Sequence, residues 1–225
     1  MMNAPPSPPL ADILKLPDHP KPGAPLIVLL HGRGADRNDM VPLGDWMPRG
    51  AMLAFPEAPF PAAPWGYGPG AAWYRFLGGT TPEPESFVGG QELLGRYLDH
   101  LPSRLPVAPG RLVLGGFSQG GTSALAWALT HPGRVSAVIM LSGFLADHAS
   151  VRATLETVRG TEFFWGHGTE DGNIPHPLGQ AGRGALLAAG ASLTAKDYPM
   201  GHTIVHEELG DVRQWLGAHK IGDER

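Results

Sequence analysis

Short apolar segments recur along the chain, and each one is followed by a turn. They are residues 26–32 (LIVLLHG), 51–58 (AMLAFPEA), 111–118 (RLVLGGFS), 135–143 (VSAVIMLSG), 161–168 (TEFFWGHG) and 192–201 (SLTAKDYPMG). Most of them are nearly continuous in apolar character, which is typical of strands that are buried on both faces of a sheet. The pattern therefore predicts a series of short buried strands.

Segments with helical periodicity lie between these strands. Residues 89–105 and 202–220 repeat apolar side chains on one face: Leu93, Leu94, Tyr97, Leu98 and Leu101 in the first segment, and Val205, Leu209, Val212 and Leu216 in the second. Residues 121–133, 148–158 and 177–189 are also predicted to be helical. Strands that alternate with helices indicate an α/β fold with a mostly parallel sheet.

Two stretches depart from this alternation. Residues 1–25 carry much of the proline, and we predict an extended arm with one short edge strand near residues 13–16, followed by a single domain over residues 26–225. Residues 56–87 form a long segment rich in Pro, Gly and aromatic side chains directly after a predicted strand. Ligands bind at the carboxyl ends of parallel strands, so this segment is predicted to wall a substrate pocket.

Composition narrows the class of protein. The 225 residues carry a net charge of −4, which offers no electrostatic case for binding nucleic acid. The chain has no cysteine, which excludes disulfides, thiolate metal sites and a cysteine nucleophile, and fits the cytoplasm. The first residues lack the basic start and apolar run of a secretory signal, and no segment reaches the ~18 apolar residues that span a bilayer. We therefore expect a cytoplasmic protein without integral membrane association.

The segment GGFSQGG (residues 115–121) places one serine, Ser118, between a predicted strand and a predicted helix. A strand–Ser–helix turn is the nucleophile elbow of many hydrolases, whose strained backbone tolerates no large neighbouring side chains. Glycines at 116, 120 and 121 meet that requirement. The alternative is a tight turn with an idle serine, which this context disfavours.

A serine hydroxyl needs a general base, and His202 follows the last predicted strand in the sequence YPMGH. His202 is expected to open the last helix, with His206 one turn further along. A histidine that only caps the helix is one alternative. A metal pair at this i, i+4 spacing is another, but the Glu of an H-E-x-x-H motif is missing. We expect no metal and no cofactor.

Two further groups are needed around the serine and the histidine. An acid should orient the imidazole, and the candidates at strand ends are Glu170, Asp171 and Asp147. Two amides should stabilise an oxyanion, and we expect those of Gln119 and of Arg33, which lies in the loop LLHGRGAD (29–36). This loop has a simpler interpretation as a strand-ending turn, in which His31 is structural. The Arg33 side chain is interpreted as a solvated charge, with contact to an acidic substrate as the alternative.

The long segment also offers candidates for an acyl or aryl pocket. These are Trp65, Tyr67, Trp73, Tyr74 and Phe76. Packing within the loop explains each of them equally well. The connection between the VSAVIM and TEFFW strands has room for one helix, so we expect no cap domain and an open cleft.

Together these motifs resemble the phospholipase/carboxylesterase family of α/β-hydrolases, which includes bacterial carboxylesterases and acyl-protein thioesterases. The resemblance rests on residues 29–43 (LLHGRGADRNDMVPL), 115–121, 167–175 (HGTEDGNIP) and 198–202, and it spans about residues 26–220. It implies an α/β-hydrolase fold, with a mostly parallel central sheet, helices on both faces and no cap domain. It also implies Ser118 as nucleophile, Asp171 as acid, His202 as base, and the amides of Arg33 and Gln119 as oxyanion hole.

The function that this resemblance implies is a carboxylesterase acting on small to medium carboxylic esters. An acyl thioesterase or a lysophospholipase with the same triad is the nearest alternative. A non-catalytic binding protein on a hydrolase scaffold is a more distant one, because every triad position is filled. The expected partner is a small-molecule ester, with no nucleic acid, and a homodimer is a further hypothesis.

Overall fold

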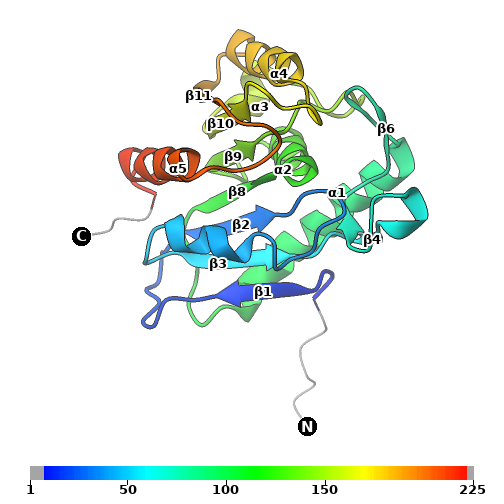
Figure 1. The fold of residues 1–225 in the computed structure, drawn as a ribbon. Coiled ribbons are helices and arrows are strands. Elements are labelled where there is room, and N and C mark those ends of the chain that lie inside the picture. Colours follow the sequence, from blue (N-terminus) through cyan, green and yellow to red (C-terminus); the bar gives the residue numbers. More distant parts are fainter. Residues whose placement is uncertain (1–7, 222–225) are drawn as a thin grey trace.

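The computed structural model describes residues 8–221. Within them, a seven-stranded sheet forms the centre of the molecule, in the order β1-β3-β2-β8-β9-β10-β11 (Figure 1). Its strands are β1 (Asp12–Lys15), β2 (Leu26–Leu30), β3 (Met52–Pro56), β8 (Leu112–Phe117), β9 (Ala137–Leu141), β10 (Glu162–Gly168) and β11 (Ser192–Tyr198). All neighbouring strands are parallel except β1 and β3, which are antiparallel. The six predicted strands are all present, so the mostly parallel sheet is confirmed.

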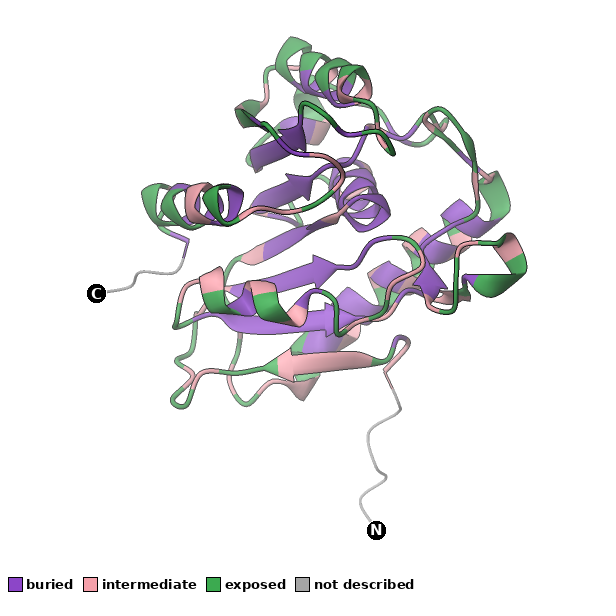
Figure 2. Cartoon of the chain, in the orientation of Figure 1, coloured by how far each residue is buried: buried purple, intermediate pink, exposed green. Residues whose placement is uncertain are grey.

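Helices cover both faces of the sheet and divide the core in two. Helices α1 (Pro84–His100), α2 (Gln119–Thr130), α3 (Leu155–Val158) and α4 (His176–Ala188) contribute to the cluster on one face. Helix α5 (His206–Ala218) and the 3₁₀ helix η1 (Val41–Trp46) pack with their flanking residues on the other. Strands β2, β3 and β9 are buried along their whole length, as Figure 2 shows, which explains their continuous apolar sequences.

Three predicted helices begin four or more residues away from the predicted position. Helix α1 begins at Pro84 rather than 89, because Pro84 occupies the first turn and the Glu83 side chain caps the amide of Ser86 at 2.8 Å. The helix predicted over 148–158 is confined to α3, since His148 forms local hydrogen bonds with Ser150 that favour a turn. The remaining connection between β9 and β10 holds no cap domain.

The last helix also begins later than expected. Helix α5 starts at His206, with Val205 in extended conformation before it. His202 therefore does not open a helix but lies in the loop that joins β11 to α5. This difference frees its ring from the helix geometry and lets the loop present it at the strand ends.

The long segment over residues 56–87 is more ordered than a plain loop. It contains two small antiparallel pairs, β4 (Phe60–Pro61) with β5 (Ala71–Ala72) and β6 (Phe76–Gly78) with β7 (Thr81–Pro82). The 3₁₀ helix η2 (Ala63–Trp65) lies between the first two. The Gly34 amide donates to the Ala71 carbonyl, and the Ala71 amide donates to the Ala35 carbonyl, each at 2.8 Å. These two hydrogen bonds join the segment to the loop after β2.

The amino-terminal arm joins the sheet. The predicted edge strand near residues 13–16 is β1, and it is the half-buried strand at the end of the sheet in Figure 2. Part of the predicted arm falls on residues 1–7, as does the start of the sequence that we expect not to be a secretory signal. These residues lie outside the part of the chain that the structure describes. The division at residue 25 stays a prediction. Across residues 8–221, no helix combines the length and apolarity needed to cross a bilayer.

A buried ion pair holds β1 in place. The Asp12 side chain is 4% exposed, and both its oxygens accept hydrogen bonds from Arg104, at 2.7 and 2.8 Å. The Tyr97 hydroxyl donates to the same carboxylate at 2.7 Å. Arg104 lies in the 3₁₀ helix η3 (Leu101–Arg104), so this contact ties the edge strand to the end of α1.

We expect Arg104→Met to lower the free energy of unfolding by about 2–4 kcal/mol, because it leaves the Asp12 carboxylate buried without its cation. Adding Asp12→Asn should recover at least half of that loss, since the amide can still accept from Tyr97. Denaturant unfolding measures both. Arg96→Met, which removes an exposed pair, is the control and should cost under about 0.5 kcal/mol. An equal, small effect of the two arginine changes would contradict a structural role for the buried pair.

Candidate active site

Ser118 occupies a strained turn between β8 and α2. Its backbone φ of 55° and ψ of −120° lie in a region that residues other than glycine rarely adopt. The Ser118 amide donates to the carbonyl of Leu141 on β9 at 2.8 Å, which helps to hold the turn. A Cβ at Gly116 or Gly120 would overlap the carbonyl oxygen of Leu30 at the end of β2. These glycines therefore let the turn pack directly against the neighbouring strand.

Three side chains from distant parts of the sequence meet at this turn. His202 Nε2 lies 2.9 Å from Ser118 Oγ, and His202 Nδ1 lies 2.7 Å from Asp171 Oδ2. The Asp171 side chain is fully buried, and its Oδ1 accepts from the amides of Asn173 and Ile174 at 2.9 and 2.8 Å. Three hydrogen bonds thus fix the carboxylate, and the carboxylate fixes the imidazole.

The other acids and the second histidine lie elsewhere. Asp147 and Glu170 are exposed, and neither forms a hydrogen bond with His202. The His206 ring stacks on Trp46 with a centroid distance of 5.4 Å, at the start of α5. Both ring nitrogens of His202 are already engaged by Ser118 and Asp171. Among residues 8–221, no group of three or more His, Asp or Glu side chains is arranged to hold a metal ion.

Two backbone amides adjoin the serine. Gln119 is the first residue of α2, where amides point out of the helix and its dipole is positive. Arg33 follows Gly32, whose Cβ would lie only 3.7 Å from that of Ser118. Within the described residues, neither of these two amides donates to a protein acceptor. Both are therefore available to an oxygen bound at Ser118.

The side chain of Gln119 has a second role that sequence reasoning missed. Its Oε1 accepts from the Trp73 amide and its Nε2 donates to the Tyr74 carbonyl, each at 2.8 Å. The buried amide thereby joins the start of α2 to the long segment like one more rung of a sheet. The GFSQGG motif contains this glutamine, but only the tertiary structure shows what it bridges.

His31 supports the loop after β2, as expected for a structural residue. Its Nδ1 lies 2.7 Å from the Gly32 carbonyl, and its Nε2 accepts from the Ala58 amide at 2.9 Å. The ring is fully buried, and this burial lowers its pKa below the usual range. A neutral His31 therefore ties the loop that carries Arg33 to the end of β3.

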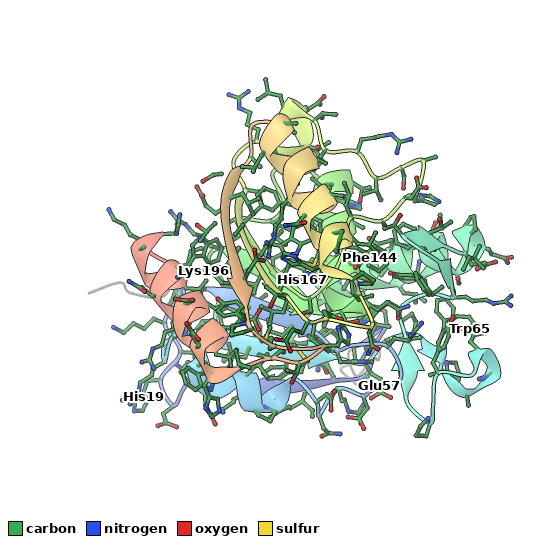
Figure 3. All side chains as sticks on the ribbon, turned by 45° about the horizontal axis from the view of Figure 1, so that its top comes forward. His19, Glu57, Trp65, Phe144, His167 and Lys196 are labelled. Carbon is green, nitrogen blue, oxygen red and sulfur yellow. The ribbon has the colours of Figure 1, made fainter. Side chains whose placement is uncertain are left out.

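His167 supports the loop that carries Asp171, and sequence reasoning missed it. Its Nε2 lies 2.9 Å from the Ile174 carbonyl, and the ring packs against Gly179 of α4. Burial lowers the pKa of this histidine as well. Figure 3 shows His167 near the centre of the molecule, between the strands and α4. The sequence HGTED holds both residues, but their spacing alone does not separate a supporting histidine from a catalytic one.

A small cavity of about 40 Å³ opens beside Ser118. Its lining residues are Arg33, Tyr74, Phe76, Ser118, Gln119, Phe144, Asn173 and Ile174. Two of the five predicted pocket aromatics are therefore in the lining, and three are not. Phe144, Asn173 and Ile174 come from loops after β9 and β10 and were not predicted.

The three other aromatics have structural surroundings instead. Trp73 is buried, and its indole Nε1 donates to the His31 carbonyl at 2.9 Å. Trp65 packs against Phe60 and Tyr67, and Figure 3 shows it at the periphery, away from Phe144. The Tyr67 hydroxyl bonds the backbone of Phe76. None of the three lines the cavity beside Ser118, because each contacts its own loop or the loop after β2, and their role as pocket residues stays a prediction.

One buried acid beneath the site has an unusual environment. The Glu208 side chain on α5 is fully buried against Gly166 of β10, the strand that leads to Asp171. Within the described residues, neither of its oxygens has a hydrogen-bond partner. Burial raises the pKa of Glu208 to about 8, with the Arg183 charge opposing the shift and Asp211 adding to it. Glu208 is therefore neutral in the folded protein at moderately acidic pH.

Comparisons with known proteins show the family of this chain. A family model described as Phospholipase/Carboxylesterase matches residues 17–220. A protein named probable carboxylesterase from Oryza sativa subsp. japonica is 36% identical over 115 residues, which cover 50% of this chain and 43% of that protein. Acyl-protein thioesterase 1 of Gibberella zeae is 35% identical over 114 residues, 49% of this chain and 48% of its own length. The matched segments thus span about half of these relatives.

A solved structure extends the likeness over the whole fold. Acyl-protein thioesterase 2 of Zea mays superposes with a TM-score of 0.75 at 25% identity, covering 92% of this chain and 98% of its own. The α/β-hydrolase fold with helices on both faces of the sheet, predicted from the sequence, is confirmed.

The raised pKa of Glu208 predicts a pH-dependent stability. An acid whose pKa rises on folding binds its proton more tightly in the folded state, so its cost is absent below the unfolded value of about 4.5 and grows as pH rises to about 8. Glu208→Gln should therefore match the wild type near pH 5 and exceed it in stability at pH 8. Thermal unfolding across this range measures the difference.

The neighbouring exposed acid provides the control, since Glu207→Gln should shift the melting temperature little and equally at both pH values. A Glu208→Gln variant with the same stability difference at pH 5 and pH 8 would show that Glu208 is charged throughout.

Proposed function

Since the chain belongs to the phospholipase/carboxylesterase family, we propose that it is a serine hydrolase that cleaves small to medium carboxylic esters through an acyl-enzyme. The observation that supports this most is the continuous hydrogen-bonded chain from Ser118 through His202 to Asp171. Ser118 lies on a strained turn beside two available amides. The packing of the fold does not require this combination.

In the first half of the proposed reaction, His202 Nε2 takes the proton of Ser118 Oγ as the oxygen attacks the ester carbonyl carbon. The negative charge that develops on the carbonyl oxygen is stabilised by the amides of Arg33 and Gln119. Asp171 holds the imidazole in the required tautomer and stabilises its charged form. His202 then donates the proton to the leaving alcohol.

In the second half, a water molecule gives its proton to His202 Nε2 and attacks the acyl-enzyme at the same carbon. The oxyanion again faces the two amides, and collapse of the intermediate returns the proton to Ser118 and releases the acid. Every step uses side chains or amides of this chain.

The same triad could serve a thioesterase or a lysophospholipase, and the Gibberella zeae and Zea mays relatives are named as acyl-protein thioesterases. We favour oxygen esters of limited size because the cavity beside Ser118 is small and no cap encloses it. Rates on oxygen esters and thioesters with the same acyl chain would rank the two. The cytoplasm and a homodimer stay predictions from the sequence.

We predict that a fluorophosphonate adds once to the wild type and not to Ser118→Ala. The reagent needs an activated serine, and loss of the Ser118 hydroxyl removes the proposed enzyme nucleophile to which the reagent would add. Intact-mass spectrometry measures the adduct. An unlabelled wild type that is fully folded by circular dichroism would favour the non-catalytic binding protein.

We also expect a large effect from changing Asp171, the proposed acid of the triad. Asp171→Asn should keep the fold but lower kcat for a short ester by roughly 10³- to 10⁴-fold, because an amide NH₂ facing Nδ1 forces the proton to Nε2, where His202 can no longer accept one. Steady-state kinetics measure it. Glu170→Gln, the adjacent exposed acid, should change kcat less than about twofold. Similar losses in both variants would remove Asp171 from the mechanism.

A further inference from the structure

One charged side chain lies at the cavity beside Ser118. Arg33 is the sole member of the cavity lining that carries a charge, since the other lining residues are aromatic, aliphatic, amide or hydroxyl side chains. Within residues 8–221, no Asp or Glu lies within 4.0 Å of its guanidinium, whereas Arg104, Arg134 and Arg183 all have carboxylate partners. Its charge is therefore free to meet a ligand.

The guanidinium is held over an aromatic shelf. It lies 4.5 Å from the centroid of the Tyr67 ring and 5.5 Å from that of Phe76. The Tyr67 hydroxyl accepts from the Phe76 amide at 2.9 Å and lies 3.2 Å from the Phe76 carbonyl oxygen, so the Tyr67 side chain is held against the Phe76 backbone. This shelf lowers the freedom of the long side chain and orients its fork before any ligand arrives.

A second polar group in the same cavity lacks a partner. The Tyr74 side chain lines the cavity, is 1% exposed, and within the described residues its hydroxyl has no hydrogen-bond partner. Burial raises the pKa of this hydroxyl, with the neighbouring Thr122 side chain and the Arg33 charge opposing the shift, so it stays a neutral donor. A buried hydroxyl without a partner costs free energy, which a ligand oxygen in the cavity would offset.

We propose that Arg33 and Tyr74 select esters that carry an anionic oxygen group, a carboxylate or a phosphate, within a few bonds of the scissile carbonyl. Arg33 supplies the bidentate charged donor and Tyr74 the buried hydroxyl, while Phe76 and Phe144 contact the short apolar spacer. Arg33 and Ser118 lie in the lining of one small cavity of about 40 Å³, which places the cation near the site of attack. This inference rests on the proposed ester hydrolysis, and it narrows the substrate class of the same site.

The test compares matched esters in two arms. For an anion on the acyl side, the pair is monophenyl glutarate and phenyl pentanoate. For an anion on the alcohol side, it is the butanoate esters of 4-hydroxybenzoate and of 4-hydroxybenzamide. In one of the arms, the ratio of kcat/KM for the anionic over the neutral ester should be at least about tenfold higher in the wild type than in Arg33→Gln.

Taking a ratio separates the charge from the backbone amide of Arg33, because both esters of a pair use the same oxyanion donors. The wild-type ratio should also fall as salt rises from 0.02 to 0.5 M, on the order of severalfold, since exposed charges are screened. Arg33→Lys should retain part of the ratio. Tyr74→Phe should lower it less than Arg33→Gln does. Arg75 is an exposed arginine of the 56–87 segment that lies outside the cavity lining, and Arg75→Gln should leave the ratio unchanged.

The outcomes separate this inference from the function on which it rests. Equal ratios in the wild type and Arg33→Gln in both arms, with the neutral esters hydrolysed, would overturn the anion preference and leave the esterase standing. A folded wild type that hydrolyses none of the four esters would overturn both.

Discussion

The end of β2 and the first turn of α2 approach each other closely, and the turn at Ser118 depends on this contact. Gly116 and Gly120 face the Leu30 carbonyl at a separation that no Cβ could occupy. This contact brings the loop after β2 close to Ser118, next to which the amides of Arg33 and Gln119 are the proposed oxyanion donors. The strained φ of Ser118 persists because β2, β9 and α2 hold the turn from three sides.

Buried polar side chains then hold the loops around this turn. His31 ties one loop to the end of β3, His167 ties another to the carbonyl of Ile174, and the Gln119 amide joins the start of α2 to the long segment. Burial lowers the pKa of both histidines, so neutral His31 uses both ring nitrogens in hydrogen bonds and neutral His167 uses its Nε2. The side chains that hold these loops are therefore neutral, and the charged side chains at the site are Asp171 and Arg33.

The site is asymmetric in a way that bears on substrate choice. The Asp171 carboxylate is fully buried and forms three hydrogen bonds, one of them with His202, so it is not available to a substrate. Arg33 is exposed, and the aromatic shelf of Tyr67 and Phe76 orients it toward the cavity. On the proposed preference, the cation on this shelf makes the small cavity complementary to an anion rather than to a long alkyl chain. The proposed oxyanion hole and the proposed preference thus use different groups of Arg33, its backbone amide and its side chain.

The sequence by itself determined the sheet strands, the turn at Ser118 and the position of His202 after the last strand, and it left three acids open until the family resemblance favoured Asp171. Those features depend on local patterns, namely apolar runs, glycines and residues placed directly after strands. Only the tertiary structure decided between Asp171, Glu170 and Asp147 from contacts, and only it moved His202 out of the last helix. It also separated Tyr74 and Phe76 from Trp65, Tyr67 and Trp73, and revealed Glu208 and His167. The direction of a loop side chain and the burial of a helix residue depend on what packs against them, and that is set by segments far away in the chain.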